Sequence, residues 1–433
     1  MRVLLVGDLR SVKGNYGAMA TSEQLIRQIK KYDVELKCID WRSFCTPTPP
    51  EGWQDSVEEY LAHTPVTRNT FPLRQCMKQL LPYGLVIKRQ DRMKANLNRV
   101  PFVPYRYRDY ADFAQRVEKG ELLQYENSML SWADIVVFNS EGNIVRGTDA
   151  CGYYRIGGLY ILFMEYLSKV IKRKPTYVIN HTVDPGNRDI IEIIKNTYPT
   201  MDGVLIRERK SLQLVRSWGI TNARLVPDAL FLYNEEENKA EGLPQQFLEK
   251  RDPAKKLICL GDSSGMFNAF GHVKWDLCDF YVELIGKLQQ KGFQIAFIDG
   301  GNGGDADINN AVEKYGLIHL MMTNCNYKQL YNVLKEAEIF ISGRWHASIL
   351  SLQAGTPILL WGADSHKTEA LYDLVDYEYK FFDVASLPLH IDDIVEETMR
   401  ILQNDNAKTF EIVAQLKEQA KQNSYMLELQ EEK

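Results

Sequence analysis

Short apolar runs alternate with amphipathic stretches along most of this chain, and a polar stretch at residues 233–256 interrupts the alternation once. Runs that are apolar throughout are typical of parallel strands covered by helices on both faces. We therefore predict an α/β fold of two Rossmann-like domains, residues 1–235 and 236–433, with a central cleft where the carboxyl ends of the strands place functional side chains. The predicted strands are 3–6, 135–138, 176–180, 204–206, 224–226, 257–260, 294–298 and 339–342, and the predicted helices are 22–30, 158–171, 210–218, 274–290, 327–336 and a helical tail at 391–433.

Length and composition support this division and exclude several classes of protein. A chain of 433 residues is too long for one ordinary core. Its net charge of −5 gives the whole molecule no general attraction for nucleic acid. The 7 cysteines include no Cys-x-x-Cys pair, which favours a reducing compartment over a disulfide framework or a zinc site. We find no signal-peptide pattern and no apolar run long enough to span a bilayer, so we expect a cytoplasmic protein.

One segment departs from the alternation. Residues 64–110 carry ten Lys and Arg against two Asp, interleaved with aromatic and aliphatic residues. This composition suits a surface that rests on anionic headgroups or on a pyrophosphate-bearing lipid carrier. A solvated insertion packed on the first domain explains it equally well, and binding of single-stranded nucleic acid explains it less well.

The segment FISGRWHASILSLQAGTPILLW, residues 340–361, places Arg344 and His346 where a predicted strand passes into a helix. Backbone N–H groups and the helix dipole favour an anion at such a point. The Arg344 guanidinium matches a phosphate or carboxylate, and an imidazole exchanges protons near neutral pH. The pattern predicts an anion site beside an acid–base group, although a structural arginine and a capping histidine would produce the same letters.

Other loops that follow predicted strands carry weaker signals. Gly14, Gly17 and Ala18 permit close backbone approach, and Thr21 with Gln24 fits a capping box. A plain turn explains these glycines as well. Other residues that follow predicted strands could face the cleft, and each also has a structural explanation. Glu141 and Asn143 could cap a helix, and so could His181 and Asp184. One of Arg207 and Arg209 could form a surface ion pair, and residues 297–307, which could bind phosphate, could be a surface turn.

The sequence contains no His-Glu-x-x-His, the pattern of many zinc peptidases. We expect no obligatory metal and no cofactor.

Four segments, taken in order, resemble the polysaccharide pyruvyl transferase family. They are GNYGAMATSEQLI (14–26), VLIRERKSLQLVRSWGITNARLVPDALFLY (204–233), the segment 340–361 and SHKTEALYDLV (365–375). The second segment carries the Arg-(Asp/Glu)-x-x-Ser…Gly…Pro-Asp pattern as Arg207, Glu208, Ser211, Gly219, Pro227 and Asp228. The resemblance implies a glycosyltransferase-B-like arrangement of the two domains. It also implies transfer of the enolpyruvyl group of phosphoenolpyruvate to a sugar, which forms a pyruvate ketal and releases phosphate.

By the same resemblance, Arg344 and Arg207 hold the phosphate and carboxylate of phosphoenolpyruvate, and His346 is the general acid–base. The expected substrate-binding residues are Asn15, Gly17, Glu141, Asn143, Trp345 and Lys367. Trp345 replaces the leucine that is usual between the arginine and the histidine, and we expect it to narrow the site or stack on a sugar. Glu141 stands where the family often has a glycine-rich turn, and we expect it to contact acceptor hydroxyls.

These inferences predict a pyruvyltransferase of bacterial surface or capsular polysaccharide biosynthesis, peripheral to the inner face of the plasma membrane. Its expected acceptor is a sugar, such as a hexose with free 4- and 6-hydroxyls, on a polyprenyl-pyrophosphate carrier. Two alternatives stay open: a glycosyltransferase that uses a nucleotide sugar, and a protein without catalytic activity that binds glycans or membranes.

Overall fold

The computed structural model describes residues 1–7, 16–40, 103–104, 106–145, 152–238, 241–267, 273, 275–300, 314–322 and 324–431. Several predictions fall outside these residues. Most of the basic segment 64–110 lies there, as do Asn15, Gly14 and residues 301–307. They remain predictions.

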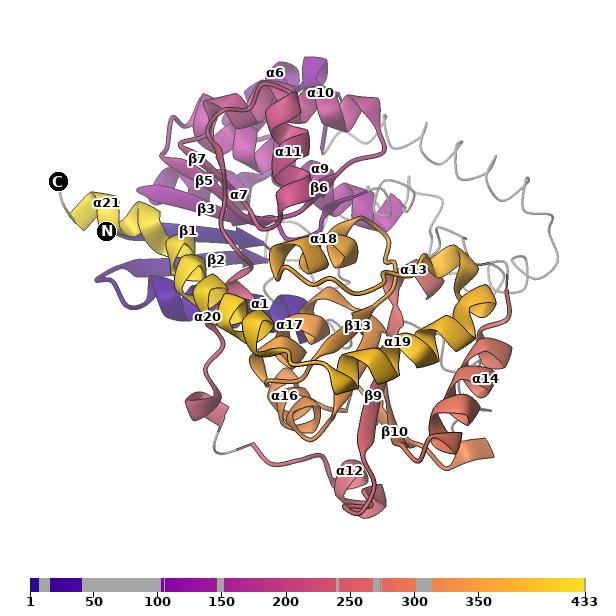
Figure 1. Cartoon of the computed structure of the whole chain (residues 1–433). Helices are drawn as coiled ribbons and strands as arrows, with labels where there is room; N and C mark the ends of the chain where they lie inside the picture. Colours follow the sequence, from indigo (N-terminus) through magenta and orange to yellow (C-terminus); the bar gives the residue numbers. More distant parts are fainter. Residues whose placement is uncertain are drawn as a thin grey trace. The chain divides into compact units, whose positions relative to one another are not determined.

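The chain forms two compact units that exchange short segments (Figure 1). Unit 1 comprises Met1–Arg10, Ile29–Ile206 and Ser211–Arg224, and unit 2 comprises Ser11–Gln28, Arg207–Lys210 and Leu225–Lys433. The two units do not correspond to a single domain boundary after residue 235, and that boundary remains a prediction. In the division into units, Gly17 and Arg207 belong to the same unit as Arg344 and His346.

Unit 1 is built on a six-stranded sheet with the order β2-β1-β3-β5-β7-β8. The four pairings from β2 to β7 are parallel, with Val6 opposite Phe138 and Phe138 opposite Val178. Strands β3 and β5 are buried along their whole length, as expected of strands covered on both faces. The strands are β1 (Arg2–Gly7), β2 (Glu35–Asp40), β3 (Ile135–Asn139), β5 (Thr176–His181), β7 (Gly203–Ile206) and β8 (Ala223–Leu225), with a separate parallel pair β4 (Ile144–Val145) and β6 (Val183–Asp184).

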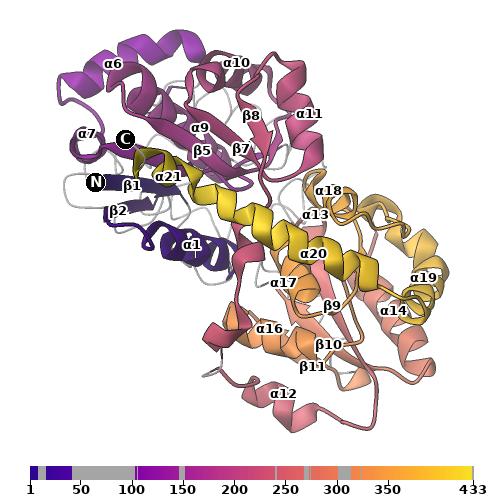
Figure 2. The same ribbon diagram turned by 60° about the vertical axis from the view of Figure 1, so that its left-hand side comes forward.

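The helices of unit 1 lie beside this sheet, and α10 packs against α9 (Figure 2). Helix α10 shows how its sequence specifies it. Asn187 caps its first turn by accepting from the Asp189 N–H at 2.8 Å, and Ile190, Ile193 and Ile194 form its buried face. The helices are α6 (Tyr110–Glu118), α7 (Gln124–Trp132), α9 (Gly152–Tyr166), which continues into a π turn (Leu167–Ile171), α10 (Arg188–Thr197) and α11 (Arg209–Ser217).

Unit 2 contains a five-stranded parallel sheet with the order β11-β10-β9-β12-β13. Its strands are β9 (Leu257–Ser263), β10 (Gln294–Asp299), β11 (Ile318–Met321), β12 (Ile339–Gly343) and β13 (Ile358–Leu360). Its helices are α1 (Tyr16–Ile29), α12 (Gln245–Lys250), α13 (Ser264–Phe267), α14 (Leu277–Gln290), α16 (Tyr327–Lys335), α17 (Trp345–Gln353), α18 (Lys367–Leu374), α19 (Ile391–Gln403), α20 (Ala407–Ala420) and α21 (Tyr425–Glu431). Short 3-10 turns include η5 (Ala229–Leu232), η6 (Glu235–Asn238), η7 (Val384–His390) and η8 (Lys421–Ser424).

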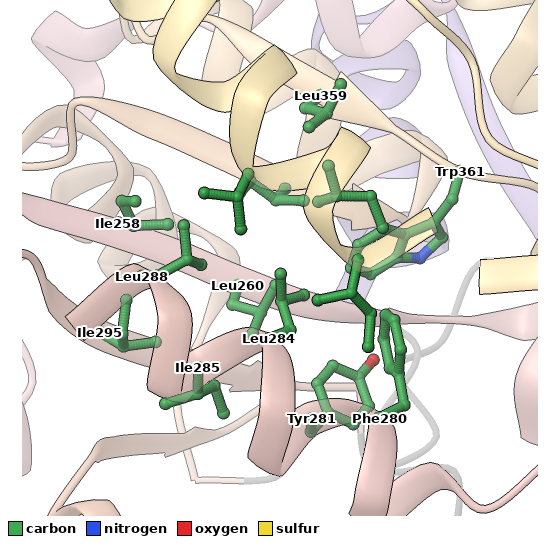
Figure 3. Packing of buried hydrophobic residues seen from close by; sticks show 14 of the residues in the cluster. Ile258, Leu260, Phe280, Tyr281, Leu284, Ile285, Leu288, Ile295, Leu359 and Trp361 are labelled. Carbon is green, nitrogen blue, oxygen red and sulfur yellow. The ribbon is translucent and has the colours of Figure 1, made fainter. Parts of the chain in front are cut away.

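The core of unit 2 forms where α14 and α19 pack on the sheet (Figure 3). Leu260 of β9 and Leu284 of α14 are fully buried in it. Phe280 meets Trp361 edge to face, with ring centroids 6.0 Å apart. Burying large aliphatic and aromatic side chains supplies the main stabilisation of such a layer, about 25 cal/mol for each Å² of apolar surface.

The predicted α/β fold is confirmed, and two helices begin earlier than predicted. The helix predicted at 158–171 starts at Gly152. The helix predicted at 22–30 starts at Tyr16, so Gly17 lies inside α1 rather than in a glycine loop. Thr21 and Gln24 are therefore within the helix and do not form a capping box at its start. Ala18, Ala20 and Leu25 of α1 are buried. Within the described ranges, no helix combines the length and apolarity that crossing a membrane requires.

A buried carboxyl group in unit 1 gives a test of this fold. Glu126 of α7 is 1% exposed, and its Oε1 accepts a hydrogen bond from the Tyr160 hydroxyl at 2.9 Å. Its Oε2 has no partner among the described residues. Burial raises the pKa of Glu126 from 4.5 to about 8, although the Tyr160 hydrogen bond opposes the shift.

We expect Glu126→Gln to flatten the dependence of stability on pH. Between pH 4.5 and about 8 the native wild type keeps a proton that the unfolded chain has released. Its free energy of unfolding should therefore fall as pH rises, by up to about 1.4 kcal/mol per pH unit. Urea denaturation from pH 5 to 8 should show this slope in wild type and in the exposed control Glu121→Gln. Equal slopes in wild type and Glu126→Gln would contradict the prediction.

Candidate functional site

The carboxyl end of β12 carries the first group of candidate residues. The pairing of β12 with β9 shifts register between Ile341 and Gly343, a bulge of the kind that redirects a side chain. The Ser342 hydroxyl donates to the Asp262 carbonyl at 2.9 Å and accepts from the Arg344 N–H at 3.1 Å. The backbone is thus fixed where Arg344 forms the N-cap of α17.

The Arg344 guanidinium is paired side-on with the carboxylate of Asp262. Nη2 donates to Oδ2 at 2.7 Å, and Nε donates to Oδ1. The Asp262 side chain is 2% exposed and that of Arg344 is 18% exposed. Burial alone lowers the pKa of Arg344, but the attraction and hydrogen bonds of Asp262 outweigh it and raise that pKa above its ordinary value. Gly300 lies against the guanidinium, since a Cβ there would be 2.6 Å from Nη2.

A second buried carboxylate, Asp228, gathers several donors. Its Oδ2 accepts from Arg207 Nη1 and from Trp345 Nε1, each at 2.8 Å. Its Oδ1 accepts from the Leu230 N–H at 2.9 Å and from the Thr21 hydroxyl at 3.4 Å. The Arg207 guanidinium also lies 4.9 Å from the centroid of the Trp345 ring, within cation–π range. Asp228, Arg207 and Trp345 are all buried, so these charges are shielded from water.

His346 lies at the partly exposed rim of the Asp228 group. Its Nε2 is 3.7 Å from Asp228 Oδ2, and its side chain is 19% exposed. Gly17 of α1 approaches the ring so closely that a Cβ there would be 2.2 Å from Nδ1. Gly17 therefore supports the position of the imidazole by close backbone approach, which a larger residue would prevent.

Lys367 begins α18 and donates to Asp364 Oδ1 at 2.6 Å. Burial alone raises the pKa of Asp364, but Lys367 and the hydroxyl of Ser264, which donates at 3.0 Å, outweigh it and lower that pKa. The preceding residue, His366, places Nε2 3.2 Å from Oε1 of Glu208, a carboxylate with no exposed surface.

Unit 1 carries its candidate residues on the loop that follows β3. Glu141 has a φ of 45°, and Asn180 at the end of β5 has a φ of 54°. Such left-handed conformations are uncommon for residues with side chains and tend to cluster at functional sites. Asn180 Nδ2 donates to Glu141 Oε1 at 3.1 Å and to Asn139 Oδ1 at 3.2 Å. The Glu141 carboxylate is therefore oriented by the amide of Asn180.

Asn143 and His181 have structural contacts in the same loop. The Asn143 amide donates back to the Ser140 carbonyl at 3.0 Å. His181 Nδ1 lies 3.0 Å from the Glu141 carbonyl, so it donates there, and Nε2 accepts from the Tyr198 hydroxyl at 2.9 Å. His181 is fully buried with both nitrogens bonded, which favours a structural role.

The structure brings Gly17, Arg207, Arg344, Trp345, His346 and Lys367 into unit 2, whereas Glu141 and Asn143 belong to unit 1. The sequence left open which of Arg207 and Arg209 faces the cleft and which forms a surface ion pair. Arg207 is buried, whereas Arg209 is exposed and donates to the Asp373 carbonyl. Residues that sequence reasoning did not place in the site are Asp228, Asp262, Asp364, Glu208 and His366. Asp228 and Glu208 stand in the quoted 204–233 segment, and Asp364 directly precedes the segment 365–375, three residues before Lys367. A chain with 57 acidic residues gives no such signal for Asp262.

Neither unit, taken by itself, brings three His, Cys, Asp or Glu side chains close enough together to hold a metal ion among its described residues.

Comparison with known proteins identifies the family. A model of the polysaccharide pyruvyl transferase family matches residues 15–360. The chain therefore belongs to the polysaccharide pyruvyl transferase family, as its motifs predicted. A curated relative, the amylovoran biosynthesis protein AmsJ of Erwinia amylovora, is 22% identical over 210 residues. The match covers 45% of this chain and 51% of AmsJ, so it spans about half the length of that relative.

Solved structures support the fold. A UDP-GlcNAc 2-epimerase from Neisseria meningitidis bound to UDP-GlcNAc has a TM-score of 0.56 and 11% identity, with 100% of both chains covered. Trehalose-6-phosphate synthase OtsA has a TM-score of 0.52 and 11% identity, with 98% of this chain and 96% of that chain covered. At such identities the likeness shows the fold alone, and it confirms the glycosyltransferase-B-like α/β class.

We expect Gly17→Ala to force the His346 ring out of place and to lower the free energy of unfolding by about 1–3 kcal/mol. The new methyl group would overlap the imidazole. Truncating that ring should relieve the two closest contacts and leave only the His346 Cβ, at 2.8 Å, so Gly17→Ala should cost less in a His346→Ala background. Urea denaturation of the single and double variants measures this coupling.

The control for this cycle is Gly242→Ala, whose added Cβ would meet nothing within 4 Å. It should show no coupling to His346→Ala. Additivity of Gly17→Ala and His346→Ala within about 0.5 kcal/mol would show that the two residues do not contact each other.

Proposed function

We propose that this protein transfers the enolpyruvyl group of phosphoenolpyruvate to two hydroxyls of a sugar, forming a pyruvate ketal and releasing phosphate. Family membership supports the reaction class. The observation that carries the proposal is that the N-cap of α17, Arg344, and the second residue of that helix, His346, present a guanidinium and an imidazole, each adjacent to a buried carboxylate. A multiply charged small anion fits this combination of arginine and helix N-terminus.

In the proposed donor site, Arg344 and Arg207 hold the phosphate and carboxylate of phosphoenolpyruvate, and Lys367 adds a third cation. The anchoring of Arg207 by Asp228 and of Arg344 by Asp262 supports this assignment, because fixed donors bind an anion with little loss of side-chain freedom. Arginines directed at the phosphate also stabilise the charge that accumulates on it as it leaves.

His346 is the proposed acid–base group. In the first step the protonated imidazole gives its proton to C3 of the substrate, the oxygen of a sugar hydroxyl forms a bond to the electron-deficient C2, and the proton of that hydroxyl passes to the imidazole. In the second step another sugar hydroxyl bonds to C2, the C2–O bond to phosphate breaks with its electron pair, and the hydroxyl proton is taken up by a base. Positioned proton transfer of this kind is worth about 10²–10⁴-fold in rate.

For the acceptor we propose Glu141, whose carboxylate Asn180 orients, as the group that contacts sugar hydroxyls. For Trp345 we keep one of its two predicted roles, narrowing the site. Its ring is buried, faces Arg207 and donates to Asp228, so it supports the two charged residues, and this burial does not favour stacking on a sugar. A lipid-linked acceptor and a membrane contact through residues 64–110 remain part of the proposal.

The alternative, a nucleotide-sugar glycosyltransferase, is favoured only by likeness of fold. We expect phosphoenolpyruvate to raise the melting temperature of the wild type, because ligand at 100 times its dissociation constant adds about 2.7 kcal/mol of stability. Arg344→Ala should abolish the shift, and Arg400→Ala, which removes an exposed arginine that pairs with the nearly buried Glu397, should retain it. A shift with UDP- or GDP-sugars and none with phosphoenolpyruvate would replace this proposal with the alternative.

We also expect His346→Ala to retain the thermal shift with phosphoenolpyruvate and to lose turnover by at least about 10²-fold. The assay measures phosphate released from phosphoenolpyruvate in the presence of hexosides with free 4- and 6-hydroxyls. Thermal unfolding of the variant controls for folding. Turnover near the wild-type rate would rule out the acid–base role of His346.

A further inference from the structure

Every cation of the proposed donor site has its own buried or nearly buried carboxylate. Arg207 is paired with Asp228 at 2.8 Å, Arg344 with Asp262 at 2.7 Å, and Lys367 with Asp364 at 2.6 Å. The three pairs belong to one neighbourhood. Trp345, next to Arg344, donates to Asp228, and the charge of Asp364 acts on Arg344.

The other charged residues near these three pairs do not make the site positively charged. Glu208 lies against His366, and Asp299 at the end of β10 lies 3.3 Å from His319. The charge of Asp299 also reaches Tyr16, the residue before Gly17, and so does that of Asp262. Among the described residues of unit 2, the three cations Arg207, Arg344 and Lys367 are matched by three carboxylates, and Glu208 and Asp299 add two more, so the proposed site holds at least as much negative as positive charge before any substrate binds.

The carboxylate partner of Arg344 is fixed independently of any ligand. Asp262 ends β9, its carbonyl accepts from Ser342, and its side chain is 2% exposed. An exposed counterion can rotate into solvent when an anion binds, but a buried carboxylate cannot. The charge of Asp262 therefore repels the bound anion as well as attracting Arg344. The partly buried surroundings screen this repulsion less than water would.

We propose that Asp262 and Asp364 are built-in counterions that set the affinity of the site for anions. This inference rests on the proposed phosphoenolpyruvate site. With the cations neutralised, an anion is recognised by hydrogen bonds of defined geometry and gains little from net charge. Such a site discriminates between anions by shape, and it releases the phosphate product instead of retaining it by Coulomb attraction.

The opposite expectation is that Asp262 only orients Arg344, in which case its removal weakens binding. The two ideas differ in the sign of the effect. If the counterion role dominates, removing one negative charge strengthens anion binding, about tenfold in Kd for each carboxylate. It also makes binding more sensitive to salt, because uncompensated charge is what salt screens.

The test is isothermal titration of phosphoenolpyruvate, and separately of inorganic phosphate, into the full chain at about 50 and about 300 mM salt. Wild type should show a shallow salt dependence. Asp262→Asn and Asp364→Asn should each bind both anions about tenfold more tightly at the lower salt concentration, with a steeper salt dependence. The matched control Asp392→Asn removes the same charge from a side chain that is 80% exposed on α19, and it should bind as wild type does.

Unchanged or weaker binding of both anions by the folded variants would overturn the inference, while phosphoenolpyruvate binding by wild type would still uphold the proposed function. Failure of wild type to bind phosphoenolpyruvate would overturn the proposed function. The phosphate titrations would then decide the counterion role by themselves. The two variants alter different ion pairs, so if thermal unfolding shows that one of them does not fold, the other gives the result.

Discussion

A carboxylate shielded from water must be hydrogen-bonded, because leaving it unpaired costs several kcal/mol. Asp228 meets this requirement with donors from four separate parts of the chain: Arg207, Thr21 of α1, Trp345 of α17, and the backbone of Leu230. No single element could satisfy it. The packing of α1, α17 and the segment around Arg207 in unit 2 therefore depends on this one side chain, and so does the place of His346 at its rim.

In unit 1, unfavourable backbone conformations at the ends of β3 and β5 must be stabilised by hydrogen bonds. Two residues with side chains, Glu141 and Asn180, adopt left-handed conformations that cost of order 1–3 kcal/mol each. Hydrogen bonds offset that cost: the Asn180 amide bonds Glu141, and the Glu141 carbonyl accepts from His181 and from the Thr182 N–H. Strain that is stabilised in this way holds the Glu141 carboxylate in a single orientation, which is what a group that contacts acceptor hydroxyls would need.

Pairing each cation with a carboxylate also explains how such charges are tolerated inside unit 2. A lone buried guanidinium would be strongly unfavourable, whereas one that is paired and hydrogen-bonded is tolerated. In the proposed function, the same pairing determines what kind of anion site results. Recognition of the anion then depends mainly on the directions of fixed hydrogen-bond donors. It depends less on net charge than the number of arginines and lysines would suggest.

The sequence by itself determined the α/β class, the positions of most strands, and the family. These follow from local patterns: apolar runs of strand length, and motifs carried by consecutive letters such as Arg344, Trp345 and His346. The tertiary structure alone decided that Gly17 lies within a helix against His346, that Trp345 is buried, and that Asp262 is the partner of Arg344. The physical reason is separation along the chain. Asp262 pairs with Arg344, 82 positions away, and Asp228 accepts from Trp345, 117 positions away. Only the folding of parallel strands side by side brings those carboxylates to these donors.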